Sequence, residues 1–202
     1  DGTLAVTTKA ANAGNDITDA YGSVLNNLLS TTVHPLQNDI SVHSNSEKIA
    51  ALYTLMYHRA PDQSGLGYWL NEMAQGKTMM DISRAFAGNS RFTTDYATLT
   101  NQQFVELIYK EGLGNAGDAQ GVGYWTKKLN DGQTRADLLA DFALATMTID
   151  LVKARDTKMI TDAEYLSAVA RQNALLNRID LGLEFVKQFG SATNPMAASD
   201  LD

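Results

Sequence analysis

The chain has 202 residues, 44% of them hydrophobic, so it can bury one substantial core or two small ones and is not composed like a disordered segment. Its 23 acidic and 16 basic residues give a formal charge of -7, which argues against nucleic acid as a partner because phosphate contacts need clustered Lys and Arg. The absence of cysteine excludes disulfides, thiolate catalysis and Cys-ligated zinc, and no apolar run approaches the ~20 residues of a transmembrane helix.

The first 43 residues form the first predicted segment, an N-terminal arm and helix. Residues 1–16 alternate small and polar types and predict an extended arm. After Asp16, apolar residues recur at helical spacing and predict a helix: Ile17, Ala20, Tyr21, Val24, Leu25, Leu28 and Leu29. Residues 31–42 contain Pro35 and predict a connection with a short extended piece at residues 39–42.

A first repeat is predicted at residues 44–97. Its first helix opens at Ser44, where Glu47 can complete a capping box, and has to end before Pro61. Asp62 caps the second helix, which ends near Gly76 and would bury Leu66, Trp69, Leu70 and Met73. Thr78 starts a short third helix, and residues 88–94 predict a break.

A second repeat is predicted at residues 98–155, because the pattern Asp62 to Trp69 returns 56 positions later as Asp118 to Trp125. Further pairs fall in the same register: Tyr53 and Tyr109, Gly76 and Gly132, Thr78 and Thr134, Asp81 and Asp137, Phe86 and Phe142. Thr100 and Gln103 predict a capping pair, residues 112–117 a loop, and Thr134 the start of a helix reaching about Lys153.

The last segment, residues 156–202, predicts a long helix and a tail. Thr161 and Glu164 open a helix that reaches about Phe189, which exceeds the usual ~8 to 20 residues and would project or pack on a partner. Period-two alternation is almost absent. We therefore expect an all-α fold, a helical bundle of two tandem three-helix repeats with an N-terminal helix and a long C-terminal helix.

The motifs favour packing over chemistry. Trp69 and Trp125 could stack on sugar rings if they were exposed. Both lie among the apolar residues of their helices, which favours core positions. The three histidines have no second ligand at metal-binding spacing, no G-x-S-x-G is present, and no carboxylate pair stands out. We therefore expect no catalytic residue, no bound cofactor and no enzyme activity.

Calcium is the one metal that the sequence leaves as a candidate. Asn115 and Asp118 lie in an oxygen-rich loop and are the candidate ligands. The loop lacks the Asp/Asn alternation and closing Glu of an EF-hand, so helix capping is the favoured role of Asp118.

The segment from about Ser46 to Val152 resembles the domain-of-unknown-function 4214 family. The first repeat carries the resemblance in Leu52-Tyr53, residues 58–62 (His-Arg-Ala-Pro-Asp), Gly65-Leu66 and Tyr68-Trp69-Leu70. The second repeat departs from the family pattern at Asn115 and Gly117, which stand where Arg and Pro are expected. The family has no established catalytic residues, so the resemblance implies none in this chain.

The resemblance implies a bacterial surface or secreted protein of RTX or S-layer type. Such a module would be extracellular and non-catalytic, with envelope glycan, lipopolysaccharide or neighbouring subunits as partners, and part of an oligomer or larger assembly. An alternative is a phage virion component, such as a tail or host-attachment protein. A weaker alternative is a polysaccharide hydrolase.

Overall fold

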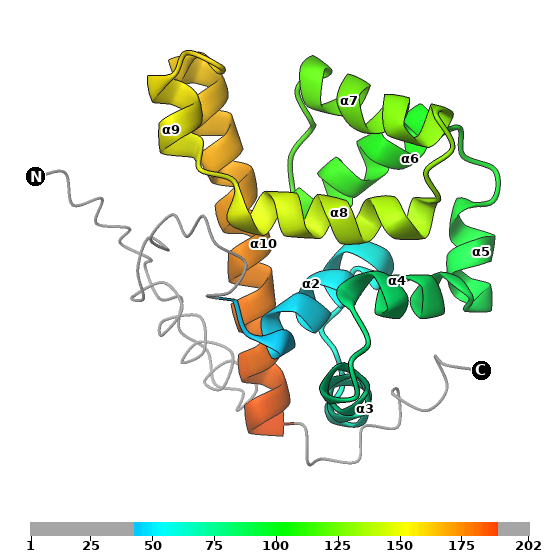
Figure 1. The fold of residues 1–202 in the computed structure, drawn as a ribbon. Coiled ribbons are helices and arrows are strands. Elements are labelled where there is room, and N and C mark those ends of the chain that lie inside the picture. Colours follow the sequence, from blue (N-terminus) through cyan, green and yellow to red (C-terminus); the bar gives the residue numbers. More distant parts are fainter. Residues whose placement is uncertain (1–42, 190–202) are drawn as a thin grey trace, which may run out of the picture. The chain divides into compact units, whose positions relative to one another are not determined.

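The computed structural model describes residues 43–189, which form helices joined by short loops (Figure 1). In chain order these are α2 (Asn45–Tyr57), α3 (Gln63–Ala74), α4 (Met79–Ala87), α5 (Ser90–Tyr96), α6 (Asn101–Leu107), the π-helical turn η2 (Ile108–Gly112), α7 (Ala119–Asn130), α8 (Arg135–Thr148), α9 (Leu151–Asp156) and α10 (Asp162–Phe189). Residues 43–189 contain no strand, so the predicted all-α fold is confirmed.

Several predicted segments lie outside the described residues. These are the arm at residues 1–16, the helix after Asp16, the connection at 31–42 and the tail from Ser191. The division of the chain into four segments stays a prediction.

Helices α2 and α6 begin where their predicted caps stand. Glu47 N donates to Ser44 Oγ at 3.2 Å, and Ser44 N donates to Glu47 Oε2 at 2.6 Å. Thr100 and Gln103 make the same reciprocal pair at the start of α6. Such pairs satisfy backbone amides that have no partner within the first turn. The local sequence therefore determines both helix starts.

The two repeats share one helix register. Helices α3 and α7 are both 12 residues long, and the bounds of α7 lie 56 positions after those of α3. Asp62 Oδ1 accepts a hydrogen bond from Gly65 N at 2.7 Å, and Asp118 Oδ1 accepts one from Gly121 N at 2.7 Å. In the same register α4 corresponds to the first part of α8, and α2 corresponds to α6 with η2.

The predicted break at residues 88–94 is wrong. Asn89 caps a further helix, α5, which lies at the end of the first predicted repeat. Its Phe92 and Tyr96, one helical turn apart, are 6% and 5% exposed. These two rings bury enough apolar surface to stabilise a helix of seven residues, although its sequence is mostly polar.

The prediction that one helix runs from Thr134 to about Lys153 is also wrong. Helix α8 ends at Thr148, and Ile149 is extended with ψ 127°. Asp150 Oδ1 then accepts a hydrogen bond from Lys153 N at 2.8 Å and caps α9. An Asp that satisfies a new helix start competes with continuation of the old one.

One continuous apolar core joins the repeats, and α4 packs against α8 across it. Ser83 Oγ donates to the Ala136 carbonyl at 2.6 Å within this contact. At its edge, Arg84 Nε lies 2.6 Å from Asp137 Oδ1. Each repeat therefore supplies part of the other's core, and we expect them to unfold together.

Helix α10 has the predicted start and length but a different environment from the expected one. It does not project away from the described part of the chain, because it packs along α2 and also contacts α8 and α9 (Figure 1). Its buried residues include Leu175, Leu176, Ile179 and Val186. None of the described helices is both long enough and apolar enough to cross a membrane.

The two tryptophans are not equally buried. Trp125 is 8% exposed, as predicted for a core residue. Trp69 is only partly buried, although it packs against the core at its edge. The difference follows from the neighbours of each helix, since α7 packs against α6 and α8 whereas α3 packs mainly against α2.

Candidate functional site

An arginine organises the loop between α2 and α3. The Arg59 guanidinium lies 5.0 Å from the centroid of the Tyr53 ring. Arg59 Nη1 donates to the Ala60 carbonyl at 3.1 Å and lies 3.5 Å from Asp62 Oδ2. A Cβ on Gly65 would lie 2.4 Å from the Tyr53 hydroxyl, so glycine is needed for this close approach. We call this set of contacts the arginine node.

The second repeat has an arginine node whose arginine comes from α10. The Arg171 guanidinium lies 5.7 Å from the centroid of the Tyr109 ring. Arg171 Nη1 donates to the Ala116 carbonyl at 3.3 Å, and Nη2 lies 2.7 Å from Asp118 Oδ2. All three partners are the counterparts, 56 positions later, of the partners of Arg59.

The arginine of the second node comes from α10, so the second loop does not need an arginine at the position where the family pattern has one. Asn115 occupies the position of Arg59 in the second loop and is exposed. Arg171 instead reaches the loop from a helix more than 50 positions further along the chain. The Arg171 side chain is 9% exposed, against 26% for Arg59, so the second guanidinium is the more deeply buried of the two.

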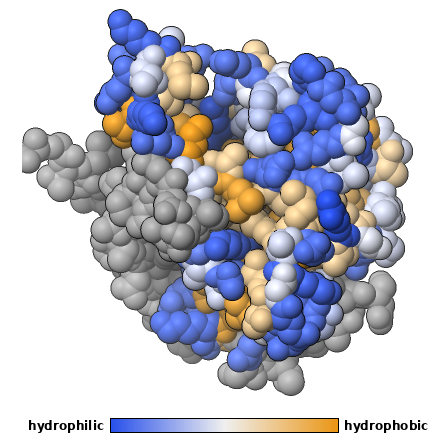
Figure 2. All heavy atoms as spheres, viewed as in Figure 1, coloured by the Kyte–Doolittle hydropathy of each residue, from blue (hydrophilic) through white to orange (hydrophobic). Residues whose placement is uncertain are grey.

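A cleft of about 580 Å³ adjoins the second arginine node, between α7, α8, α9 and the first half of α10. Its apolar lining includes Tyr109, Tyr124, Trp125, Phe142, Ile149, Leu151, Met159 and Ile160, and its polar lining includes Asp118, Gln120, Glu164, Arg171 and Gln172. Figure 2 shows hydrophobic surface beside α9 and α10, whereas the outer side of α7 is mostly hydrophilic. We call this space the aromatic cleft.

Tyr124 gives the aromatic cleft an exposed ring. Tyr124 is 55% exposed, and its ring contacts Trp125 edge to face at 5.0 Å. Its counterpart Tyr68 is also 55% exposed and contacts Trp69 in the same way at 4.8 Å. Tyr68 lines neither of the two cavities described here. Each repeat thus has an exposed tyrosine packed against a tryptophan, and only the tyrosine of the second repeat lines one of these cavities.

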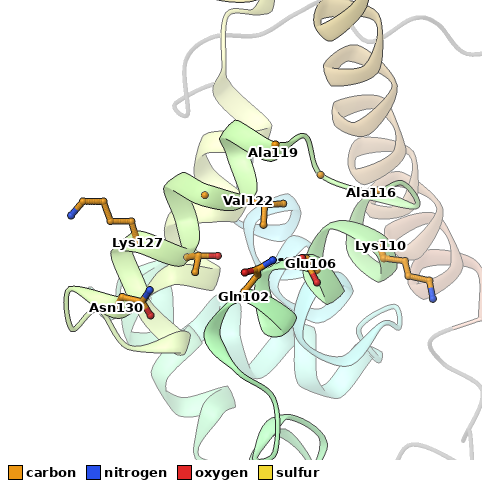
Figure 3. A pocket seen from close by; sticks show the side chains of 11 residues that line it. Gln102, Glu106, Lys110, Ala116, Ala119, Val122, Lys127 and Asn130 are labelled. Atoms are coloured by element: carbon orange, nitrogen blue, oxygen red, sulfur yellow. Dashed lines mark hydrogen bonds between the residues drawn. The ribbon is translucent and has the colours of Figure 1, made fainter.

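A second cavity, the polar groove, lies between α6 and α7 and has a volume of about 780 Å³. Figure 3 shows Gln102 and Glu106 facing the inside of this groove, with Lys110 and Lys127 extending outward on opposite sides. Gln102 Nε2 donates to Glu106 Oε1 at 2.8 Å. Thr126 Oγ1 lines the groove, is buried and has no hydrogen-bond partner.

The candidate calcium ligands do not form a metal cluster. Both oxygens of Asp118 are occupied, Oδ1 by Gly121 N and Oδ2 by Arg171. A cation at Asp118 would lie beside the positively charged guanidinium, which disfavours its binding. Within residues 43–189 no group of three His, Cys, Asp or Glu side chains could hold a metal ion. Capping by Asp118 is confirmed, and the role of Asn115 and Asp118 in calcium binding stays a prediction.

The described histidines have structural partners. His43 Nε2 lies 3.2 Å from the Met147 carbonyl, and His58 Nε2 lies 3.1 Å from the Tyr96 hydroxyl. Partial burial lowers the pKa of His58, which favours the neutral ring. His34 lies outside the described residues.

Two carboxylates, Asp118 and Glu164, line the aromatic cleft. Glu164 caps α10, and hydrogen bonds from Thr161 hold the pKa of the Glu164 carboxyl below its ordinary value. A general acid for glycoside hydrolysis needs a raised pKa. The environment of Glu164 therefore works against such a role.

Sequence reasoning did not identify either cavity. It assigned Asp118 to a cap and examined the tryptophans, but it did not single out Tyr124 or Arg171. A usable signal existed for the tyrosine, because a position next to a buried Trp on a helix points away from the core. Arg171 had no local signal, since its partners lie on another helix and loop.

The family comparison agrees with the resemblance seen in the sequence. The model described as Domain of unknown function (DUF4214) matches residues 36–87 and residues 83–149. No curated protein and no solved structure matched the chain. The two matches together span more than half of the chain, and the protein therefore belongs to the DUF4214 family.

Proposed function

We propose that the protein is a non-catalytic binding module of a bacterial surface or secreted protein, and that it binds envelope glycan in the aromatic cleft. The observation that carries the proposal is Tyr124, a half-exposed ring at the edge of a cleft that also contains polar side chains. An exposed aromatic ring can stack on the apolar face of a sugar, and the ring gains affinity by covering that face.

The other side chains of the cleft suit a sugar ligand. Gln120 offers an exposed amide group, and Glu164 offers a carboxylate oxygen. These groups donate to or accept from sugar hydroxyls. The apolar lining supplies contact area, while the few polar groups fix the orientation of a bound ring.

Non-catalytic binding is favoured over hydrolysis by the state of the carboxylates. Asp118 is engaged by Arg171, and the pKa of Glu164 is lowered by Thr161. The lowered pKa of Glu164 is the opposite of the raised pKa that a general acid for glycoside cleavage needs, and the Asp118 carboxylate is held in an ion pair. Asp118→Asn and Glu164→Gln variants would test the hydrolase alternative, since a loss of measurable polysaccharide turnover in either would support it.

The experiment is binding of the full chain to lipopolysaccharide and to the polysaccharide released from it, by isothermal titration calorimetry with and without calcium. We expect Tyr124→Ala to abolish measurable binding and Tyr68→Ala to leave it unchanged. Tyr68 is the matched control because it has the same exposure and the same contact with a tryptophan.

Two outcomes would contradict the proposal. The first is an absence of binding to any envelope fraction. The second is an equal loss of binding in the Tyr68 and Tyr124 variants, which would place the ligand elsewhere. A gain of binding on adding calcium that Asn115→Ala removes would instead support the candidate calcium ligands.

A virion component is the second candidate function. It is favoured by Leu166, which lies on α10 and is 68% exposed, since a large exposed apolar residue on a long helix suits contact with another subunit. The identity of neighbouring genes discriminates, because tail and capsid genes favour a virion whereas a type I exporter favours a secreted surface protein.

A further inference from the structure

The polar groove of the second repeat corresponds to a face of the first repeat that a helix covers. Ala116 and Gly117 line the groove, and their counterparts are Ala60 and Pro61. α10 packs along α2 and crosses this loop at Gly182, where an added Cβ would lie 3.2 Å from Ala60 Cβ and 3.7 Å from Pro61 Cδ.

The same correspondence holds on the helix that forms the wall of the groove. Glu106 and Lys110 line the groove and are exposed. Their counterparts on α2 are Ala50 and Thr54, which are 0% and 6% exposed. The equivalent helix face is thus uncharged and buried in the first repeat, but charged and open in the second.

The open groove has the form of a helix-binding site. Gly123 lines it, and a Cβ at that position would meet nothing within 4 Å, so there is room between the two helices. Thr126 Oγ1 is buried there without a hydrogen-bond partner. A buried hydroxyl without a partner costs free energy, so this wall of the groove is incompletely satisfied in the single chain.

The first half of α10 presents a face that suits the groove. Four exposed residues lie on one side of the helix, three or four positions apart: Ala163, Leu166, Ser167 and Ala170. The small side chains permit close approach of two helices, as Gly182 does at the first repeat. Leu166 is 68% exposed and would meet the apolar floor at Val122.

The contact is apolar rather than ionic. Lys127 Nζ lies 2.5 Å from Asp131 Oδ2, Lys110 Nζ lies 3.7 Å from Glu111 Oε1, and Glu106 Oε1 accepts from Gln102. The charged groups of the groove are therefore paired within the chain, and the α10 face of Ala163, Leu166, Ser167 and Ala170 carries no charge.

We infer that the polar groove of one molecule binds the Ala163–Ala170 face of α10 in a second copy of the chain. Groove and helix face are different surfaces, so the contact is heterologous and leaves one of each free at the ends. Repetition of the contact would generate a ring or an open chain of subunits. This inference does not depend on glycan binding, since the aromatic cleft has a different lining.

The test is the molar mass of the full chain by sedimentation velocity, from low micromolar to the highest soluble concentration. We expect mass to rise with concentration beyond that of a dimer. Gly123→Glu fills the groove and Leu166→Glu alters the helix face, so each variant alone should remain monomeric.

Mixing the two variants gives the decisive result. The Leu166→Glu chain keeps an intact groove and the Gly123→Glu chain keeps an intact helix face, so the mixture should form dimers and nothing larger. Gly67→Glu is the matched control, because Gly67 is the counterpart of Gly123 and its Cβ would also be free of contacts. It should assemble like the parent.

Circular dichroism of each variant checks that the helices are retained. The inference is overturned if the parent stays monomeric at every concentration, if Gly67→Glu disrupts assembly as strongly as Gly123→Glu, or if the mixed variants form no dimer. Glycan binding by a monomeric parent would leave the proposed function intact and remove only the assembly.

Discussion

The two repeats reach the same local geometry from different parts of the chain. In the first, Arg59 belongs to the loop that it organises, whereas in the second Arg171 comes from α10. Both arginines contact a tyrosine ring, an alanine carbonyl and the Asp that caps the next helix. In both loops an arginine makes the same three kinds of contact, although it comes from a different part of the chain in each. The second repeat depends on α10 as a result.

Replacement of a tryptophan should give the largest loss of stability, and the loss should differ between the two repeats. We expect Trp125→Ala to cost about 3 to 5 kcal/mol of unfolding free energy, because the ring is 8% exposed and packs on Phe142 at 5.4 Å. Trp69→Ala should cost less, since Trp69 is only partly buried. Denaturant unfolding followed by circular dichroism measures both. Equal stability in the parent and both variants would contradict the described core.

Loss of the arginine from either arginine node should give the next largest loss of stability. We expect Arg171→Ala to cost about 2 kcal/mol, because it removes a charged hydrogen bond to Asp118 at 2.7 Å from a largely buried site. Arg59→Ala should cost less, given its longer distance to Asp62 and greater exposure. Thermal unfolding is the measurement.

A rescue experiment sharpens this prediction. Asn115→Arg restores an arginine at the position that Arg59 has in the first loop, so it should recover part of the stability lost by Arg171→Ala. The same substitution in the parent should gain nothing, because Arg171 already occupies the site. Failure of the rescue would show that Arg171 acts through packing of α10 alone.

The sequence predicts the helix starts well because each depends on a few adjacent side chains. Ser44, Asp62, Thr100 and Asp118 all act as the predicted caps. The helix at residues 90–96 was missed because its stability comes from rings that pack on distant elements.

The candidate site was harder to predict for the same reason. The aromatic cleft is lined by residues of α7, α8, α9 and α10, and the polar groove by residues of α6 and α7. No local pattern in the sequence specifies how these helices are arranged relative to one another. The duplication did predict that Tyr68 and Tyr124 are equivalent, but their different surroundings follow from the path of α10.

Acid should weaken the cap of the first repeat. Burial would raise the pKa of the Asp62 carboxyl, but hydrogen bonds from Ser64 and Gly65 and the charge of Arg59 outweigh it, so the pKa is lowered from its ordinary value of 3.8. A lowered pKa in the folded state stabilises the protein above pH 3.8, and that contribution is lost as pH falls through the folded-state value. Asp62→Asn should therefore flatten the stability curve below about pH 4. Denaturant midpoints measured across this range provide the test, and an unchanged slope would contradict it.

The smallest expected change in stability tests whether Gly67 and Gly123, which are counterparts in the two repeats, behave alike. Gly67 and Gly123 lie inside α3 and α7, and a Cβ at either position would meet nothing within 4 Å. Alanine reduces the freedom of the unfolded chain at a compatible helical position, so each Gly→Ala change should stabilise the protein by about 0.5 to 1 kcal/mol. The two gains should be equal and additive, because the sites lie on different helices without shared contacts. A gain confined to Gly67→Ala would mean that Gly123 is needed for a close contact at the polar groove, and only an assembled form of the chain supplies one.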